Sequence, residues 1–262
     1  MAQWNAQDYA QSSSAQAAWA QDLIVKLNLS GNETVLDVGC GDGKVTAEIA
    51  RRLPDGFVLG IDSSSEMVQF ANAENLESAI ANLQFACMDA RKIDSSRTFD
   101  VVFSNAVLHW VDDHPAFLRG ASQVLRSRGK LVTSCGGKGN AADVVSVFEA
   151  LIQQPTWNPY FTNFQFPYFF YSADEYFDWL AESGLQSVRV DLVPKDMIHS
   201  GRESLAGWIR TTWMPYVHRV PEARREDLIE EFLKEYLNQH PLDRQGNSHV
   251  KMVRLEVEAI KI

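Results

Sequence analysis

A short glycine-rich segment with an acid before it offers the clearest chemistry in this sequence. Gly39, Gly41 and Gly43 alternate with other residues, and Asp37 stands two residues before the first of them. Glycines let a backbone approach a ligand closely, and a helix that begins after them presents free N–H groups. Dinucleotide sites use Gly-x-Gly-x-x-Gly and bind an anionic pyrophosphate, which disfavours a carboxylate here. The segment therefore favours a ligand with an ammonium and a sulfonium group, although Asp37 could instead be a turn or helix-cap acid.

Two more acids follow later strand-like runs. Asp62 comes directly after Phe57–Ile61, where a carboxylate can accept hydrogen bonds from both ribose hydroxyls; it could also cap the next helix. Asp89 follows the run Leu83–Cys87 and could accept the amino group of adenine, while the Ala90 backbone N–H donates to the ring. An ordinary loop acid is the alternative for Asp89.

The elements that must position these residues alternate between strands and helices. This alternation predicts βαβ units with a parallel sheet. Ser63 or Ser64 is a candidate cap for one helix, with Glu66 close enough for a capping box. The predicted strands are 34–38, 57–61, 83–87, 99–104, 129–135, 187–193 and 250–262. The predicted helices are 14–27, 44–53, about 64–73 with a second part to 80, 115–125, 172–183, and 203–239 with breaks near Pro215 and Pro221.

These residues resemble the class I S-adenosylmethionine-dependent methyltransferases. The resemblance rests on the segments 35–44, 60–64, 88–90 and 99–105 and covers about residues 30–135. It implies an α/β, Rossmann-like fold: a seven-stranded, mostly parallel sheet with an antiparallel last strand, and S-adenosyl-L-methionine as cofactor. The cofactor-binding residues that it implies are Asp37, Gly39, Gly41, Gly43, Asp62, Ser63, Met67, Asp89, Ala90 and Asn105.

Further segments are similar to trans-aconitate methyltransferase and its relatives, which form esters on small carboxylates. These segments are 4–9, 105–113 and a helical insertion at 203–249. Glutamine precedes the tryptophan of the second segment in that enzyme, whereas His109 stands here, as in the juvenile hormone acid methyltransferases. We therefore expect a single methyltransferase domain over 1–262, with a cofactor-binding core at about 30–135 and a helical substrate cap at about 194–249.

His109 is the candidate catalytic residue, as a donor to a substrate oxygen or as a base for a phenol; packing near Trp110 is the alternative. A carboxylate is already ionised at neutral pH, so its methylation needs alignment and a dry pocket rather than a base. For Arg210 the alternative to substrate binding is an exposed surface position. For Trp110, Trp208 and Trp213 the alternative is packing in the core, and for Trp4 and Tyr9 it is a frayed N-terminal tail. The candidate substrate-binding residues are Trp4, Tyr9, His109, Trp110, Trp208, Arg210 and Trp213. The aromatic run 157–171 is interpreted as core under the cap, and it favours a partly apolar acid.

Composition narrows the classes of partner and of metal or disulfide site that the protein could have. The net charge of −10 and the pI of about 5.1 disfavour nucleic acid and anionic membranes as partners. Three separated cysteines without a CxxC pair indicate neither a disulfide framework nor a zinc site, and we expect a cytoplasmic protein without a metal. The sequence thus predicts methylation of a small molecule, most simply at a carboxylate oxygen. The alternatives are a carrier-bound acyl group, an amine or a phenol as acceptor, or a non-catalytic cofactor-binding protein.

Overall fold

A seven-stranded sheet in the order β3-β2-β1-β4-β5-β7-β6 organises the protein. The computed structural model describes residues 14–262, so the candidate residues Trp4 and Tyr9 lie outside the described residues. Strands β1 to β5 pair in parallel, and β7 pairs with β5 in the antiparallel direction, which confirms the predicted fold class. The strands are β1 (Thr34–Val38), β2 (Phe57–Asp62), β3 (Leu83–Cys87), β4 (Phe99–Asn105), β5 (Leu125–Gly136), β6 (Leu185–His199) and β7 (Ser248–Lys261).

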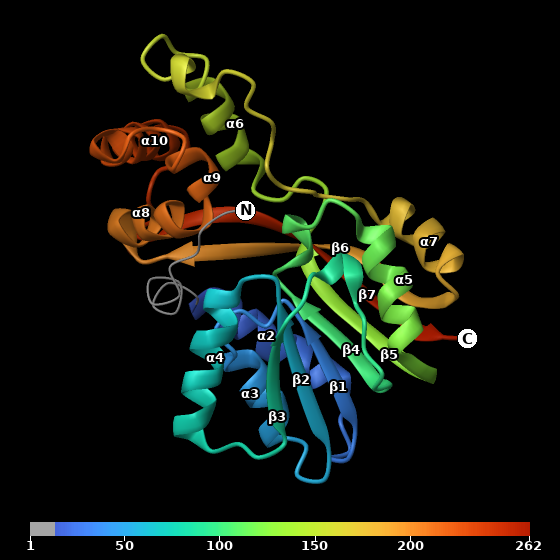
Figure 1. Ribbon diagram of the computed structural model, residues 1–262. Helices are drawn as coiled ribbons and strands as arrows, with labels where there is room; N and C mark the ends of the chain where they lie inside the picture. Colours follow the sequence, from blue (N-terminus) through green and yellow to red (C-terminus); the bar gives the residue numbers. More distant parts are fainter. Residues whose placement is uncertain (1–13) are drawn as a thin grey trace. The chain divides into compact units, whose positions relative to one another are not determined.

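Helices cover both faces of this sheet (Figure 1). One core cluster joins α2 (Ser14–Leu27) and α3 (Lys44–Arg51) to one face through residues such as Leu27, Ile49 and Val35. A second cluster joins α5 (His114–Val124) and α7 (Ala173–Glu182) to the opposite face through residues such as Phe117 and Leu180. Because successive strand residues face opposite sides, Asp37 shares the side of Val35 while Leu36 and Val38 pack on the other.

Side-chain caps set where several helices begin. Ser64 caps α4 (Ser65–Ser78) by accepting the Met67 N–H at 3.3 Å, so the expected capping box with Glu66 is wrong: Met67, not Glu66, is the third helical residue. The helix is also continuous rather than divided near Ala73. A complete capping box occurs instead at the start of α7, between Ser172 and Glu175.

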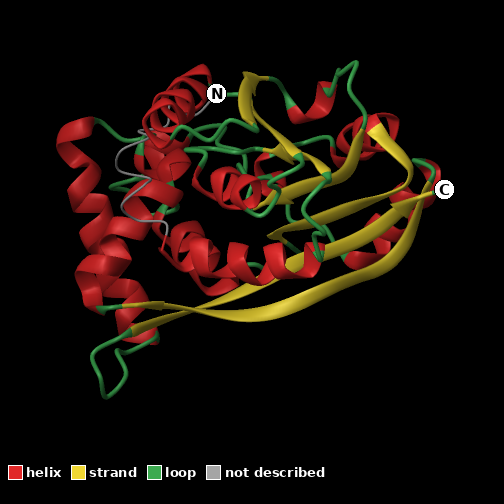
Figure 2. Ribbon diagram, turned by 90° about the horizontal axis from the view of Figure 1, so that it is seen from below, coloured by secondary structure: helices red, strands yellow, loops and turns green. Residues whose placement is uncertain are grey.

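The chain divides into two compact units. The sheet unit contains the described residues up to Lys138 together with Tyr168–Val193 and Arg254–Ile262. The helical unit contains Gly139–Pro167 and Pro194–Val253. The boundaries fall inside β6 and β7, which are longer than the other strands and lie side by side (Figure 2).

The helical unit is larger than the insertion expected at about 194–249, because α6 (Ala142–Leu151) also belongs to it. Its other α-helices are α8 (Gly201–Thr212), α9 (Met214–Val217) and α10 (Arg225–Gln239). Phe148 of α6 lies 5.5, 4.4 and 4.5 Å, between ring centroids, from Trp213, Tyr216 and Phe232. The aromatic run 157–171 is not one core: its residues up to Pro167 belong to this unit and the rest to the sheet unit.

Candidate functional site

The glycine loop has the backbone geometry that its sequence indicates. Gly39, Gly41 and Gly43 all have positive φ, at 78°, 53° and 81°. A Cβ on Gly39 would lie 2.3 Å from the Val107 side chain, and one on Gly43 would lie 2.7 Å from Phe85. Only glycine therefore lets this loop pack so closely against β3 and the segment after β4.

Gly41 differs from its two neighbours because it is where the loop opens. A Cβ there would meet no atom of the described residues within 4 Å. Its N–H donates to the Asp62 carboxylate at 3.0 Å, and the Ser64 N–H donates to the other carboxylate oxygen at 2.9 Å. Burial raises the pKa of Asp62, against these backbone hydrogen bonds. The ends of β1 and β2 thus join in one cradle, with an open backbone position beside an oriented carboxylate.

Asp37 lies at the base of this loop with 2% of its surface exposed. Thr46 of α3 donates its hydroxyl hydrogen to the carboxylate at 2.6 Å. Burial raises the Asp37 pKa to about 7, and the nearby charge of Asp62 adds to the rise. A carboxylate in this state attracts a cation strongly, because little water screens it.

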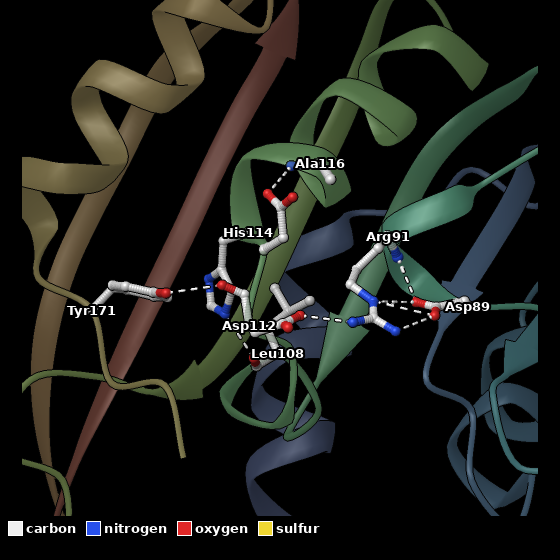
Figure 3. A network of polar contacts seen from close by, with 8 residues as sticks. Asp89, Arg91, Leu108, Asp112, His114, Ala116 and Tyr171 are labelled. Carbon is white, nitrogen blue, oxygen red and sulfur yellow. Dashed lines mark hydrogen bonds and ion pairs between the residues drawn. The ribbon is translucent and has the colours of Figure 1, made fainter. Parts of the chain in front are cut away.

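Asp89 is held by its own neighbour, Arg91, after β3 (Figure 3). The Arg91 guanidinium donates to Asp89 at 2.6 and 3.0 Å and to Asp112 at 2.9 Å. These hydrogen bonds, with the Arg91 charge, lower the pKa of Asp89, so it is ionised at neutral pH. Ala90 begins a short 3-10 helix and is buried. An adenine amino group at Asp89 would share the carboxylate with Arg91.

The segment after β4 is anchored by a buried histidine, His114 (Figure 3). Its Nε2–H donates to the Leu108 carbonyl at 2.7 Å, and Tyr176 donates to its Nδ1 at 2.5 Å. Burial lowers the His114 pKa to about 4, which keeps the ring neutral in this arrangement. Tyr171 donates to the Asp112 carbonyl at 3.0 Å, so the same segment is also tied to the start of α7.

His109 lies within this anchored segment. Its Nδ1 accepts the Gly136 N–H of β5 at 3.2 Å, and its carbonyl accepts the Phe169 N–H at 2.9 Å. Burial lowers the His109 pKa to about 3, and the positive charge of Arg254 contributes. A neutral ring whose Nδ1 is an acceptor carries its hydrogen on Nε2. His109 is therefore a hydrogen-bond donor through Nε2 and a very weak base.

Asn105 ends β4, and its side-chain oxygen accepts from Arg254 of β7 at 3.4 Å. Aromatic rings surround the nearby His109. The rings of Trp110, Tyr168 and Phe170 have centroids 5.7, 6.4 and 6.2 Å from the His109 ring. The edge of the sheet after β4 thus combines polar N–H groups with an apolar wall.

The candidates from the helical unit are placed differently. Trp208 and Trp213 are 4% and 2% exposed and lie 5.9 Å apart between ring centroids, so both pack in that unit's core. Arg210 is exposed and donates to Glu226 at 2.7 and 2.9 Å. Within the sheet unit, in contrast, the candidates from the ends of β1, β2 and β4 lie on loops that touch one another.

Among the residues of this arrangement that were not identified from the sequence are Thr46, Arg91, Gly136 and Arg254. Arg91 stands two residues after Asp89, and Thr46 is at the third position of the helix after the glycines, so local spacing could have indicated both. Arg254 and Gly136 face each other only through the β5–β7 register. Nothing in the local sequence signals that pairing.

Comparison with known proteins identifies the family. A family model described as a methyltransferase domain matches residues 29–166. The chain belongs to this methyltransferase family. An uncharacterized methyltransferase of Schizosaccharomyces pombe is 32% identical over 233 residues, covering 87% of this chain and 86% of that one. A trans-aconitate 2-methyltransferase of Escherichia coli (strain K12 / DH10B) is 26% identical over 263 residues, covering 99% and 98%.

A solved structure of geranyl diphosphate C-methyltransferase from Streptomyces coelicolor A3(2), bound to S-adenosyl-L-homocysteine, has the same fold. Its TM-score is 0.56 at 18% identity, over 94% of this chain and 79% of that one. The protein is an S-adenosylmethionine-dependent methyltransferase, and the open position at Gly41 beside Asp62 suits such a cofactor. Within residues 14–262, no helix is both long and apolar enough to cross a bilayer.

Proposed function

We propose that this methyltransferase acts on a small, partly apolar carboxylic acid and forms its methyl ester. The observation that carries the proposal is the state of His109. Its Nδ1 is occupied by the Gly136 N–H, and its pKa of about 3 keeps it neutral at physiological pH. The candidate catalytic side chain thus offers a hydrogen-bond donor and no effective base.

This chemistry matches a nucleophile that is already ionised. Bound S-adenosylmethionine supplies a methyl group on a sulfonium. A C–O bond forms between the carboxylate oxygen and the methyl carbon while the methyl C–S bond breaks, and no proton is transferred. His109 Nε2–H would hold the carboxylate, and the rings of Trp110 and Phe170 would exclude water and align it. An amine or phenol would need a base to take its proton.

The cofactor roles are part of the same proposal. The open backbone of the glycine loop would receive the methionyl group, with Asp37 as its anionic neighbour. Asp62 would accept from the ribose hydroxyls, and Asn105 would border the methyl group. The remaining proposed contacts to the nucleoside come from Ser63, Met67, Asp89 and Ala90. Three observations support these roles: the hydrogen bond from the Gly41 N–H to Asp62, the open space at Gly41 and the ionised state of Asp89.

Support for an acid as acceptor also comes from the relatives named trans-aconitate 2-methyltransferase, although their identity to this chain is only 26% over the full length. The helical unit contributes three proposed acceptor-binding residues, Trp208, Arg210 and Trp213, which support the proposal less strongly. Two of them are core residues of that unit, and Arg210 has a carboxylate partner.

A methyl-transfer screen tests the proposal. Purified protein is incubated with S-adenosylmethionine labelled in the methyl group and a panel of carboxylic acids, phenols and amines of similar size. We expect label in products that mild alkali releases as methanol, because methyl esters hydrolyse and methylated amines do not. Turnover of amines or phenols alone would exclude the ester-forming reaction while leaving the methyltransferase assignment intact.

A further inference from the structure

Arg91 bridges the loop after β3 and the segment after β4, residues 106–113 (Figure 3). On one side, its Nε and Nη2 donate to the two oxygens of Asp89 at 3.0 and 2.6 Å. On the other side, its Nη1 donates to the Asp112 carboxylate at 2.9 Å. A planar guanidinium fixes the direction of each such hydrogen bond. Arg91 therefore holds two carboxylates at once, one from each of two separate loops.

This bridge contributes little to the stability of the fold. The side chains of Arg91 and Asp112 are 43% and 55% exposed, and water screens ion pairs at such positions. The segment after β4 is also secured from the side of α5 and α7. There, His114 donates to the Leu108 carbonyl, and Tyr171 donates to the carbonyl of Asp112. Arg91 thus connects an already secured segment to the loop after β3.

Asp89 can accept a further hydrogen bond while it is held by Arg91. Three N–H groups of Arg91 donate to its two oxygens, one from the backbone and two from the guanidinium. An ionised carboxylate offers about four lone-pair sites. The hydrogen bonds from Arg91 lower the Asp89 pKa and keep it in this ionised form at neutral pH. An amino group that binds Asp89 therefore joins the bridge and does not have to break it.

We propose that Arg91 is a positioning residue that couples the nucleoside end of the cofactor site to the segment after β4. A ligand on Asp89 restricts that carboxylate, and through it Arg91 and Asp112, so their rotational freedom is given up once for both loops. His109 and Trp110 lie in the coupled segment, so a bound nucleoside would steady the acceptor side of the site. This inference rests on the proposed function, because it takes Asp89 as a nucleoside contact.

Amide hydrogen exchange tests the coupling without an acceptor. The Trp110 N–H donates to the Val107 carbonyl and the Val111 N–H to the Leu108 carbonyl, both at 2.8 Å. Exchange at these two amides therefore reports how often the segment opens. NMR measures it with and without saturating S-adenosylhomocysteine, with saturation set by calorimetry for each variant. In wild type we expect the ligand to slow exchange at both amides by about fivefold or more.

Two variants cut the bridge from opposite ends. Asp112→Ala keeps the Asp89–Arg91 pair and the hydrogen bond from Tyr171, which goes to the backbone of residue 112. Arg91→Gln removes the guanidinium itself. In each variant the slowing by the ligand should be smaller than in wild type by about threefold, as expected when a long side chain is no longer immobilised. The double variant should lose no more than either single one, because the two residues act through each other.

Arg126→Gln is the matched control. Arg126 of β5 is 49% exposed and donates to Asp100 of β4 at 2.6 Å, so it too links two elements, but Asp100 lies near the start of β4. The control should keep the wild-type slowing. Thermal unfolding of every variant identifies any loss of fold, and Asp112→Ala carries the test if Arg91→Gln does not fold.

Two results would overturn the coupling: no slowing in wild type, or the same slowing in Asp112→Ala as in wild type. The affinity of Asp89→Asn for S-adenosylhomocysteine separates this failure from that of the proposed nucleoside contact. Weaker binding by Asp89→Asn, together with full slowing in Asp112→Ala, would reject Arg91 alone. Unchanged binding by Asp89→Asn would reject the contact at Asp89 and the coupling with it.

Discussion

Replacing Asp37 with asparagine should stabilise the cofactor-free protein at neutral and alkaline pH. The Asp37 pKa rises from 3.8 to about 7 on burial. That difference of about 3 pKa units corresponds to about 4 kcal/mol at ~1.4 kcal/mol per unit. Because the pKa of Asp37 is higher in the folded than in the unfolded protein, the folded state favours the protonated carboxyl group. The folded protein therefore keeps its full stability below pH 4 and loses this contribution as the pH rises to about 7.

Asparagine removes this cost but does not reproduce every contact. Its side-chain oxygen can still accept from Thr46, while its buried NH2 group would cost about 1–3 kcal/mol if left without a partner. We therefore expect Asp37→Asn to gain about 1–3 kcal/mol in the free energy of unfolding at pH 8. This gain should shrink by about 2–3 kcal/mol between pH 8 and pH 5.

Urea unfolding of the cofactor-free protein at pH 5 and pH 8 measures the effect, with Asp55→Asn at an exposed position as the control. Calorimetry should then show that Asp37→Asn binds S-adenosylhomocysteine at least about tenfold more weakly, because the anion next to its ammonium is lost. A variant that is no more stable than wild type at pH 8, or whose stability difference is the same at both pH values, would refute the buried-charge account of Asp37.

Three more outcomes follow from the site. Asp62→Ala should weaken S-adenosylhomocysteine binding by about tenfold or more in calorimetry, since a ribose acceptor and the Gly41 N–H contact are lost; unchanged affinity rejects the ribose role. Gly39→Ala should destabilise the protein by over about 1 kcal/mol in urea unfolding, because its Cβ would lie 2.3 Å from Val107. Gly41→Ala, with no such clash, should cost less, and equal losses would contradict this packing. With saturating S-adenosylmethionine, whose ammonium keeps Asp37 ionised, the rate of ester formation should be flat from pH 6 to 8, because the His109 pKa is about 3; a step near pH 6.5 would show that His109 ionises in the reaction.

Local signals in the sequence predicted the parts of the site that depend on a few neighbouring residues. The glycines fix the turn after β1 by their positive φ, and Asp62 is the last residue of β2, so strand order brings them together. Ser172 was predicted to begin a helix, and it is the N-cap of α7, in a capping box with Glu175 that was not predicted. The capping box that was predicted with Glu66 is absent because α4 begins one residue later than that box requires.

Long-range contacts account for what the sequence did not reveal. Arg254 meets Asn105 across 149 residues, and only the register of β7 on β5 brings it there. His109 was identified as a candidate from its neighbours in sequence, but the donor role that we propose for it depends on the Gly136 N–H and on burial, which are tertiary features. Burial of Trp208 and Trp213 likewise depends on how α6, α8 and α9 pack.

The most direct test of the central claim compares wild type with His109→Gln and His109→Phe in methyl transfer to the best acid of the panel. Glutamine keeps an N–H donor near the position of Nε2, whereas phenylalanine keeps only the ring. We predict that wild type forms an alkali-labile methyl ester, that His109→Gln retains kcat/KM within about tenfold, and that His109→Phe loses about 100-fold or more. Label transferred only to amines by wild type, or equal activity in the two variants, would contradict a neutral donor acting on a carboxylate.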